Sequence, residues 1–240
     1  MTVSLILPAA GLGTRMTRTA EGEKKQFMLL DGVPILVHTI RKFIAAGSIR
    51  EIVVAARPED MASVQDMLRT EPVPVPVRVV TGGDTRQESV ENALRSLRPP
   101  PDLVAVHDAV RPFIATNTIR AVIAEAAAHG AAITGIVPVD TVKQVGPPQS
   151  GSTKIRATIP RDHLVLAQTP QVFSYRLLVD AFAAARADGF QGTDESSLVE
   201  RLETVEVRVV QGSEHNIKIT RPGDLEIARL LLRMESEKSA

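Results

Sequence analysis

The feature that most constrains the fold is an alternation of two sequence patterns through all 240 residues. Short apolar runs rich in β-branched residues predict strands, and the amphipathic stretches between them have helical periodicity. Such alternation implies βαβ units, in which a helix connects two parallel strands. We therefore predict an α/β fold: a Rossmann-like, mostly parallel open sheet with helices on both faces.

The predicted elements follow one another along the chain. The apolar runs predict strands at 3–7, 51–56, 77–81, 103–107, 132–137 and 205–210. The amphipathic stretches predict helices at 34–46, 58–69, 85–97, 117–129, 175–187, 194–202 and 222–234. Proline opens three of these helices, where a first helical turn tolerates it. Because open α/β folds often reach this size, we expect residues 1–240 to form a single domain.

One segment, at about 138–160, has no helical periodicity and is expected to form an arm. Two alternating runs, 141–145 and 154–159, flank a stretch with Gly and Pro, which is typical of a β-hairpin. A surface loop without regular structure is the alternative. An isolated hairpin is only marginally stable, so the arm is expected to need a partner surface, which dimerisation would supply.

The composition excludes several classes of function. There are 28 Lys and Arg against 28 Asp and Glu, so no net charge is available to hold a nucleic-acid polymer. The chain has 6 Phe, 1 Tyr and no Trp, which leaves few surfaces for stacking bases. With no cysteine, disulfides and thiolate nucleophiles are excluded. No uninterrupted apolar span of about 20 residues is present, so we expect no membrane segment and a cytoplasmic protein.

The strongest local signal is the turn Leu7-Pro-Ala-Ala-Gly-Leu-Gly-Thr-Arg-Met16, directly after the first predicted strand. Open α/β sheets place their ligands at such strand ends. The turn is not a P-loop, because Gly13 is followed by Thr14 and Arg15 instead of Lys and Ser or Thr. It is also not a complete dinucleotide motif, because Met16 stands in place of the third glycine.

Small residues in this turn would let a base and a sugar approach the main chain. They are Ala9, Ala10, Gly11 and Gly13, and cations follow at Arg15, Lys24 and Lys25. Cations suit a polyphosphate, so the pattern favours a nucleoside triphosphate as ligand. The alternative is a tight β-to-α turn whose cations lie in solvent.

Further short motifs extend along nearly the whole chain. They are Lys25-Gln26, Gly82-Gly83-Asp84-x-Arg86-x-x-Ser89-Val90, Val106-His107-Asp108-Ala109-x-Arg111-Pro112, Pro138-Val139-Asp140-Thr141-x-Lys143, Arg161, Gln168-Thr169-Pro170-Gln171, Thr193-Asp194-Glu195 and Asn216-Ile217-Lys218-Ile219-Thr220-x-Pro222-x-Asp224. Together with the first turn they resemble the 2-C-methyl-D-erythritol 4-phosphate cytidylyltransferase family of the non-mevalonate isoprenoid pathway. The chain departs from that family at Lys24, where the family usually carries proline.

The resemblance implies a nucleotidyltransferase that moves a cytidylyl group from CTP to 2-C-methyl-D-erythritol 4-phosphate, giving 4-diphosphocytidyl-2-C-methyl-D-erythritol and pyrophosphate. A phosphate monoester is already an anion near neutral pH, so no general base is demanded. Catalysis then consists of aligning two anions and neutralising charge, which suits cations and a metal ion. The implied cofactor is Mg²⁺, held mainly by the phosphates of CTP, with Asp108 as a candidate ligand.

The resemblance also implies roles for single residues. The implied catalytic residues are Arg15, Lys25, Arg161 and Lys218, and those that bind the sugar phosphate are Asp108, Thr141, Arg161 and Lys218. The implied nucleotide contacts are Ala9, Ala10, Gly11, Gly13, Gly83, Asp84, Ser89 and Ala109. Members of the family exchange arms in a homodimer, so Thr141 and Arg161 would enter the neighbouring active site. The alternative for Arg161 is a salt bridge within the hairpin.

Chemistry alone adds reasons for some of these residues. Asp108 follows the predicted strand 103–107, where its carboxylate can grip hydroxyls or Mg²⁺, and a helix N-cap is the alternative. Gly83 would leave room for a base, while Asp84 and Ser89 offer hydrogen-bonding groups to its edge. Ser89 would otherwise be ordinary helix surface. Lys218 lies between two isoleucines, and alternation points it away from their buried face.

The remaining polar residues are expected to be structural. The five histidines show no metal-ligand spacing, and His107 is expected to be a packed or hydrogen-bonded neighbour of Asp108. Asp194 and Glu195 are expected in a first helical turn, where the helix dipole stabilises acidic side chains.

Two other functions stay open. One is a cytidylyltransferase for a different polyol phosphate, such as ribitol 5-phosphate, whose nucleotide half would look the same. The other is a nucleotide-binding regulator without catalysis, because a fold does not define an activity. The joint presence of Arg15, Lys25, Asp108 and Lys218 argues against the regulator, since binding alone does not require cations at both the loop and the far strand.

Overall fold

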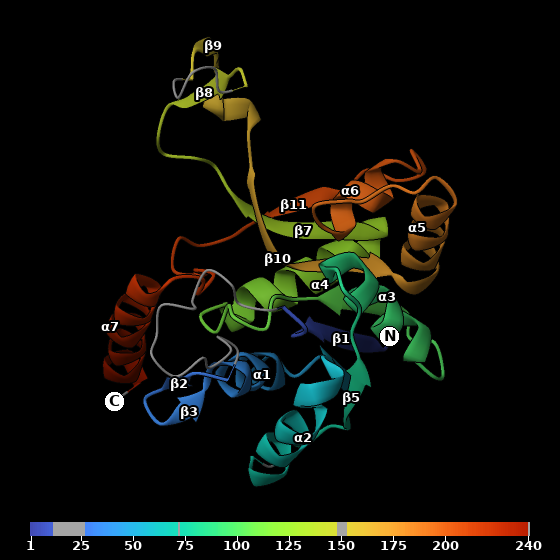
Figure 1. Ribbon diagram of the computed structural model, residues 1–240, viewed down its shortest axis with the longest axis vertical. Coiled ribbons are helices and arrows are strands. Elements are labelled where there is room, and N and C mark those ends of the chain that lie inside the picture. Colours follow the sequence, from blue (N-terminus) through green and yellow to red (C-terminus); the bar gives the residue numbers. More distant parts are fainter. Residues whose placement is uncertain (12–26, 72, 148–152, 240) are drawn as a thin grey trace.

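A seven-stranded sheet forms the centre of the protein in a computed structural model that describes residues 1–11, 27–71, 73–147 and 153–239. Its strands are β1 (Val3–Pro8), β4 (Glu51–Ala56), β5 (Val77–Thr81), β6 (Leu103–Val106), β7 (Ala131–Ile136), β10 (Leu166–Ser174) and β11 (Arg208–Gln211). They lie in the order β11-β7-β10-β6-β1-β4-β5 (Figure 1). Only β10 runs antiparallel to its neighbours, so the predicted mostly parallel α/β sheet is confirmed.

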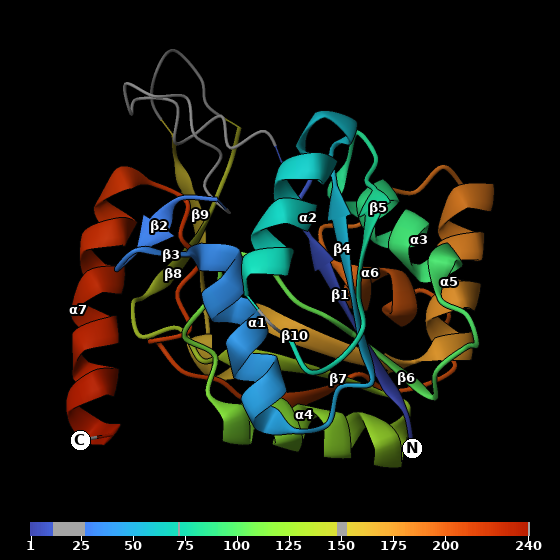
Figure 2. The ribbon, with the colours of Figure 1, turned by 90° about the horizontal axis from the view of Figure 1, so that it is seen from below.

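Helices cover both faces of this sheet, as the alternation of patterns predicts (Figures 1 and 2). The helices are α1 (Ile35–Ala46), α2 (Met61–Thr70), α3 (Arg86–Ser96), α4 (Thr116–His129), α5 (Tyr175–Ala187), α6 (Glu195–Glu200) and α7 (Pro222–Ser239). A short 3₁₀ turn, η1 (Pro58–Asp60), accounts for the start of the predicted helix 58–69. None of the helices among the described residues combines the length and apolarity needed to cross a bilayer.

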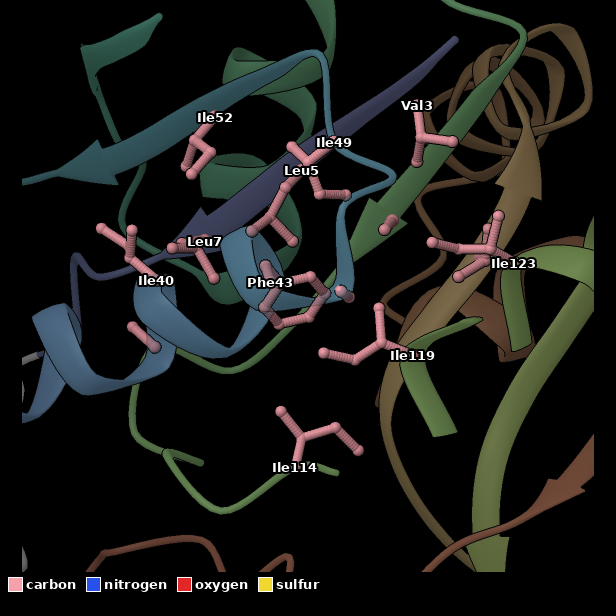
Figure 3. Packing of buried hydrophobic residues seen from close by; sticks show 14 of the residues in the cluster. Val3, Leu5, Leu7, Ile40, Phe43, Ile49, Ile52, Ile114, Ile119 and Ile123 are labelled. Carbon is pink, nitrogen blue, oxygen red and sulfur yellow. The ribbon is translucent and has the colours of Figure 1, made fainter. Parts of the chain in front are cut away.

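Alternating side chains of the buried strands divide the core between the two faces. Leu5 and Leu7 of β1 pack with α1, α2 and α4, whereas Ile6 packs with α3, α5 and α6. Figure 3 shows the first of these clusters, in which Phe43 of α1 lies among side chains from the sheet and from α4. Burying each such side chain contributes about 1.5–3 kcal/mol, so the two clusters hold the strand ends in fixed positions.

β10 is the main element that the sequence patterns did not predict. It occupies the middle of the sheet, between β6 and β7, although its sequence Leu-Ala-Gln-Thr-Pro-Gln-Val-Phe-Ser carries polar residues and a proline. The register shifts between Gln168 and Gln171, and proline in a sheet is commonly accommodated at such a bulge. The polar stretch breaks the apolar periodicity that would have marked a strand.

A second unpredicted element is a small hairpin before α1. It pairs β2 (Leu29–Leu30) with β3 (Val33–Pro34) across Asp31 and Gly32, both of which have positive φ angles of 52° and 76°. Asp-Gly is a strong signal for a two-residue hairpin turn, so this element could have been found in the sequence.

The arm forms the predicted hairpin and projects from the sheet (Figure 1). It consists of β8 (Val142–Val145) and β9 (Ile155–Ile159), which pair with each other in a separate two-stranded sheet. Three of its large apolar side chains, Val139, Val145 and Ile155, are exposed. The surface-loop alternative is therefore wrong for the described part of the arm, and residues 148–152 lie outside that part.

Candidate functional site

A pocket of about 190 Å³ opens where β1, β5 and β6 end. This is the carboxyl edge of the parallel strands, where open α/β folds bind ligands. The pocket is lined by Pro8, Ala9, Ala10, Gly11, Arg57, Gly83, Asp84, Thr85, Arg86, Ser89, Asp108, Ala109, Val110 and Lys218. All predicted nucleotide contacts among the described residues belong to this lining, and Gly13 lies outside them.

Hydrogen bonds to its main-chain groups fix the turn after β1 against its neighbours. The Ala9 N–H donates to the Ala55 carbonyl at 2.8 Å, and Arg57 Nε donates to the Ala10 carbonyl at 2.8 Å. A Cβ on Gly82 would lie 2.6 Å from Ala10 Cβ, so glycine permits the close approach of the two loops. A Cβ on Gly11 would meet nothing within 4 Å among the described residues, because Gly11 borders the pocket.

The start of α3 forms one wall of the pocket. Thr85 and Glu88 make a capping box, which satisfies N–H groups at the helix start. Ser89 is only 2% exposed, so it is not helix surface. Its hydroxyl accepts from the Gly83 N–H at 3.0 Å and donates to the Thr85 carbonyl at 2.8 Å. A Cβ on Gly83 would lie 2.3 Å from Glu88 Cβ. Glycine is therefore needed at this position for packing against α3, besides leaving the predicted room for a base.

A cluster of charged side chains lies deeper in the site, around Asp108. Asp108 Oδ2 is 3.0 Å from Lys218 Nζ and 3.1 Å from Arg111 Nε, and Oδ1 is 3.5 Å from Arg86 Nε. Arg86 Nη1 in turn donates to Glu195 Oε1 at 2.6 Å. We call these five residues the transfer cluster. Three cations face two carboxylates, so the cluster carries one excess positive charge near neutral pH.

Burial and ion pairing shift the pKa values within the transfer cluster. Burial alone would raise the pKa of Asp108, but the adjacent Lys218, Arg86 and Arg111 hold it well below its usual range. Burial raises the pKa of Glu195, an effect that Arg86 opposes. For Arg86, the two carboxylates outweigh the desolvation that would lower its pKa, and the pKa rises. The Asp108 carboxylate is therefore charged at any ordinary pH.

A second pocket, of about 260 Å³, adjoins the transfer cluster. It shares Arg86, Asp108 and Lys218 with the first pocket, and its remaining lining is Arg111, Ala167, Gln168, Thr169, Gln171, Thr193 and Asp194. Most of these side chains can form hydrogen bonds, which suits a ligand that is rich in hydroxyl groups. Sequence reasoning quoted several of these residues as motifs but assigned them no role, because it did not predict β10.

His107 is a buried neighbour of the transfer cluster. It is fully buried, and its ring meets Phe43 edge-on with centroids 4.8 Å apart. Nε2 lies 3.1 Å from the Arg111 carbonyl, which only accepts, so Nε2 carries the proton and Nδ1 accepts from the Thr169 hydroxyl at 3.0 Å. Burial lowers the pKa of His107 to about 4, so the ring is neutral. The prediction of a packed, hydrogen-bonded neighbour is confirmed.

Asp194 and Glu195 lie at the start of α6, as predicted, but they differ in environment. Asp194 caps the helix, because its Oδ1 accepts from the Ser197 N–H at 3.1 Å. Glu195 is 1% exposed and points into the transfer cluster. The predicted first-turn position of Glu195 is confirmed, but its burial and its ion pair with Arg86 were not predicted. No local signal distinguishes it, since its partner Arg86 is 109 residues away in the sequence.

Asp108 and Lys218 lie together, whereas Thr141 and Arg161 do not join them within this chain. Asp108 lies in a turn after β6 and not at the N-cap of α4, which is Ala115. Thr141 and Arg161 belong to the arm and its base, and neither lines either of the two pockets. Arg161 donates to the Val139 carbonyl, and among the described residues it forms no salt bridge within the hairpin. Arg15, Lys24 and Lys25 lie outside the described residues.

The described residues do not provide a direct magnesium site. No three His, Asp or Glu side chains gather in this part of the chain into a group that could hold a metal ion. Both oxygens of Asp108 already face cations, which a divalent ion would have to displace. The candidate role of Asp108 as a Mg²⁺ ligand therefore does not fit the donor set.

The sheet, the pocket of small residues at its carboxyl edge and the adjoining transfer cluster define a nucleotide-binding protein of the Rossmann-like α/β class. A sequence profile described as "IspD: 2-C-methyl-D-erythritol 4-phosphate cytidylyltransferase" matches residues 3–234. The chain belongs to this family of nucleotidyltransferases.

Individual relatives agree with the profile along the full chain. A 2-C-methyl-D-erythritol 4-phosphate cytidylyltransferase from Solibacter usitatus is 59% identical, with 100% of this chain and 99% of the relative covered. One from Acidobacterium capsulatum is 49% identical, with 99% of this chain and 100% of the relative covered. Among solved structures, 4-diphosphocytidyl-2C-methyl-D-erythritol synthase from Anaerococcus prevotii superposes with a TM-score of 0.82 at 30% identity, covering 97% of this chain and 98% of that one.

Proposed function

We propose that the protein transfers a cytidylyl group from CTP to 2-C-methyl-D-erythritol 4-phosphate, giving 4-diphosphocytidyl-2-C-methyl-D-erythritol and pyrophosphate. The observation that carries this proposal is that three members of the transfer cluster, Arg86, Asp108 and Lys218, line two adjoining pockets at once. The pocket of small residues takes the nucleotide, and the polar pocket takes the polyol phosphate. The reacting groups of both substrates then meet at Arg86, Asp108 and Lys218.

The chemistry at this boundary is a displacement at phosphorus. A phosphate oxygen of the acceptor forms a bond to the α-phosphorus of CTP, and the bond from that phosphorus to the bridging oxygen of pyrophosphate breaks. The acceptor is already anionic, so the main requirement is to hold two anions together and to stabilise the negative charge. Lys218 supplies a positive charge at the boundary, because its ammonium group lies beside Asp108 and lines both pockets.

Other residues complete the proposal on the basis of family membership. Arg15 and Lys25 neutralise the triphosphate, while Ala9, Ala10, Gly11, Gly13 and Ala109 seat the nucleoside and Gly83, Asp84 and Ser89 lie along the edge of the base. Mg²⁺ arrives bound to the phosphates of CTP, and no step depends on a protein ligand to the ion. The compartment is the cytoplasm, which the absence of cysteine permits.

The arm completes the site in a homodimer. Its exposed apolar side chains, Val139, Val145 and Ile155, favour contact with a second copy. Thr141 and Arg161 then reach the acceptor phosphate in the partner's polar pocket. Replacing residues 141–159 by a short Gly-Ser linker should give a monomer with strongly reduced affinity for the sugar phosphate. A variant that stays dimeric and keeps that affinity would contradict the arm's role.

Pyrophosphate release tests the reaction itself. CTP, UTP, ATP and GTP should each be combined with 2-C-methyl-D-erythritol 4-phosphate and with ribitol 5-phosphate, with and without Mg²⁺. We expect release only with CTP, the methylerythritol acceptor and Mg²⁺. Equal turnover with ribitol 5-phosphate would overturn the acceptor assignment, and no release from any pair would favour the nucleotide-binding regulator.

The loop lysines need a separate comparison, because Lys24 stands where the family usually carries proline. Lys25→Ala should lower turnover by about 100-fold, as expected for a cation that stabilises charge in the transition state. Lys24→Ala should have a much smaller effect. Turnover near that of the wild type for both variants would remove the loop lysines from the mechanism.

A further inference from the structure

Glu195 is a buried carboxylate for which the proposed reaction has no direct use. Its side chain is 1% exposed, and it lines neither of the two pockets. Oε1 accepts from Arg86, while Oε2 is buried without a hydrogen-bond partner among the described residues. Burying a carboxylate is costly unless it is paired, so this one is stable only because of the arginine.

The backbone around Glu195 is firmly anchored to the sheet. The Ser196 N–H donates to Gln171 Oε1 at 3.0 Å, and Gln171 Nε2 donates to Asp194 Oδ2 at 2.7 Å. Gln171 belongs to β10, in the middle of the sheet. The carboxylate of Glu195 is therefore held at a fixed place relative to the strand ends.

Arg86 connects this fixed carboxylate to the reacting region. Its guanidinium contacts Glu195 through Nη1 at 2.6 Å and Asp108 through Nε at 3.5 Å. Arginine suits this task, because its planar fork presents several donors in a rigid arrangement. Asp108 thus has one oxygen facing Arg86, and its other oxygen is directed to Lys218 and Arg111.

The position of Lys218 depends on the orientation of the Asp108 carboxylate more than the position of Arg111 does. Its side chain is 36% exposed and has Asp108 as its ion-pair partner, whereas Arg111 also donates to the Asn216 carbonyl. A flexible lysine loses its position when its partner carboxylate turns. Arg86, if unpaired, would be attracted to the phosphates that enter either pocket, and Glu195 opposes that attraction.

We propose that Glu195, acting through Arg86, is a positioning residue that holds Asp108 and Lys218 at the boundary of the two pockets. This proposal rests on the proposed function, since its readout is cytidylyl transfer. Glu195 touches neither substrate. Its removal should affect the transfer step more than the binding of CTP.

The test is a double-mutant cycle of Glu195→Gln, Arg86→Gln and the double variant. We expect Glu195→Gln to lower kcat by at least about tenfold, since small displacements of aligned groups have effects of this size, and to change the KM for CTP by less than about threefold. The double variant should be no worse than Arg86→Gln alone, because the two residues act as one unit.

Glu51→Gln is the matched control. Glu51 is also buried and paired with arginines, but it lines neither pocket. It should leave kcat per folded molecule unchanged. A kcat within about threefold of the wild type for Glu195→Gln, or a loss equal to that of Glu51→Gln, overturns the proposal. So does a double variant whose loss equals the product of the two single losses.

Folding and function are separated by two further measurements. Thermal unfolding of each variant gives the folded fraction, and Arg86→Lys offers a variant at a less buried position if Glu195→Gln does not fold. Arg86→Lys keeps the charge but not the fork, so it should lose at least about tenfold in kcat, and wild-type kcat would contradict the proposal. An inactive wild-type enzyme, in contrast, would refute the proposed function itself.

Discussion

Two buried carboxylates at opposite edges of the same sheet both have cationic partners, but only one of them lines the candidate site. Glu51 opens β4 at the amino edge and accepts hydrogen bonds from Ser4, Arg50 and Arg78 at 2.9, 2.7 and 3.0 Å. Asp108 follows β6 at the carboxyl edge. The two residues are 7% and 6% exposed, and in both the cationic partners lower the pKa against the effect of burial.

Charge alone does not separate the two groups. Glu51 with its two arginines has one excess positive charge, as the transfer cluster does. The difference is where their partners lie, since Arg78 of the Glu51 group lines a separate hollow between α2 and β5. Asp108, Arg86 and Lys218 line both pockets at the carboxyl edge, whereas Glu51 lines neither. Open space beside an arginine partner is therefore not enough. A buried carboxylate becomes a candidate for function where its partners line a pocket at the carboxyl edge of the parallel strands, where such sheets bind ligands.

The strongest test of this comparison is the loss of the lysine at the carboxyl edge. Lys218→Ala should lower turnover by at least about 100-fold, because it removes a positive charge from the place where two anions meet. The free energy of unfolding should change by no more than about 0.5 kcal/mol, since the side chain is partly exposed. Pyrophosphate release and chemical denaturation measure the two effects.

Lys42→Ala is the control for that variant. Lys42 is also ion-paired, with Glu235 at 2.7 Å, but it connects α1 to α7 away from both pockets. Its turnover should equal that of the wild type. Similar turnover for Lys218→Ala and Lys42→Ala would show that the transfer cluster is only structural.

Neutralising each carboxylate compares the two edges directly. Asp108→Asn should lower turnover by at least about tenfold, because it leaves three cations without their shared partner and releases Lys218. Glu51→Gln should instead lower the free energy of unfolding by about 1–3 kcal/mol, the range for a broken buried hydrogen bond to a charged group. Its turnover per folded molecule should not change. Lost turnover for Glu51→Gln, together with lost stability but normal turnover for Asp108→Asn, would reverse the roles of the two edges.

Acid should reduce the contributions of His107, near the carboxyl edge, and of Glu51, at the amino edge, to the free energy of unfolding in different pH ranges. The pKa of His107 is lowered to about 4 in the folded state, so below its unfolded value of 6.5 the unfolded chain binds more protons. The contribution of neutral His107 to the free energy of unfolding is lost as pH falls from 6.5 towards 4. The stability advantage of the wild type over His107→Gln should therefore shrink by about 1–2 kcal/mol between pH 6.5 and pH 5.

Glu51 responds in the same direction, but at lower pH. Its pKa is lowered in the folded state, so its contribution is present above the unfolded value of 4.5 and is lost as pH falls through the lower folded value. The advantage of the wild type over Glu51→Gln should stay constant from pH 7 to pH 5 and shrink only below that range. Denaturant titrations at four pH values would measure both trends, and an identical pH profile for the two variants would contradict the assignment.

Much of the fold could be predicted, because its periodic patterns are local. The parallel strands, the helices of both faces and the hairpin arm all follow from the spacing of apolar residues and from turn residues. β10 could not be predicted in this way, because Gln168, Thr169 and Gln171 face the site and other buried polar groups instead of forming an apolar face. Because β10 lines the second pocket, that pocket could not be predicted either.

The prediction of the site had the same limit. Asp108 and Lys218 were identified because each stands in a recognisable short motif at a strand end or beside buried isoleucines. Arg86 and Glu195 also stand in quoted motifs, but their importance lies in a contact between the first turns of two helices. Ser89 was expected to face the ligand or solvent, whereas its hydroxyl holds the turn before α3.

The sequence by itself determined the α/β class, the family and the identity of the residues that carry charge. Periodicity and short motifs depend on neighbours along the chain, and these can be read directly. Only the tertiary structure decided which charges meet. Glu195, Arg86, Asp108 and Lys218 come from four separate segments, and their pairing depends on how the sheet and its helices bring the segment ends together. The position of the two pockets at the carboxyl edge, which no local pattern encodes, then distinguishes the transfer cluster from the similarly buried group around Glu51.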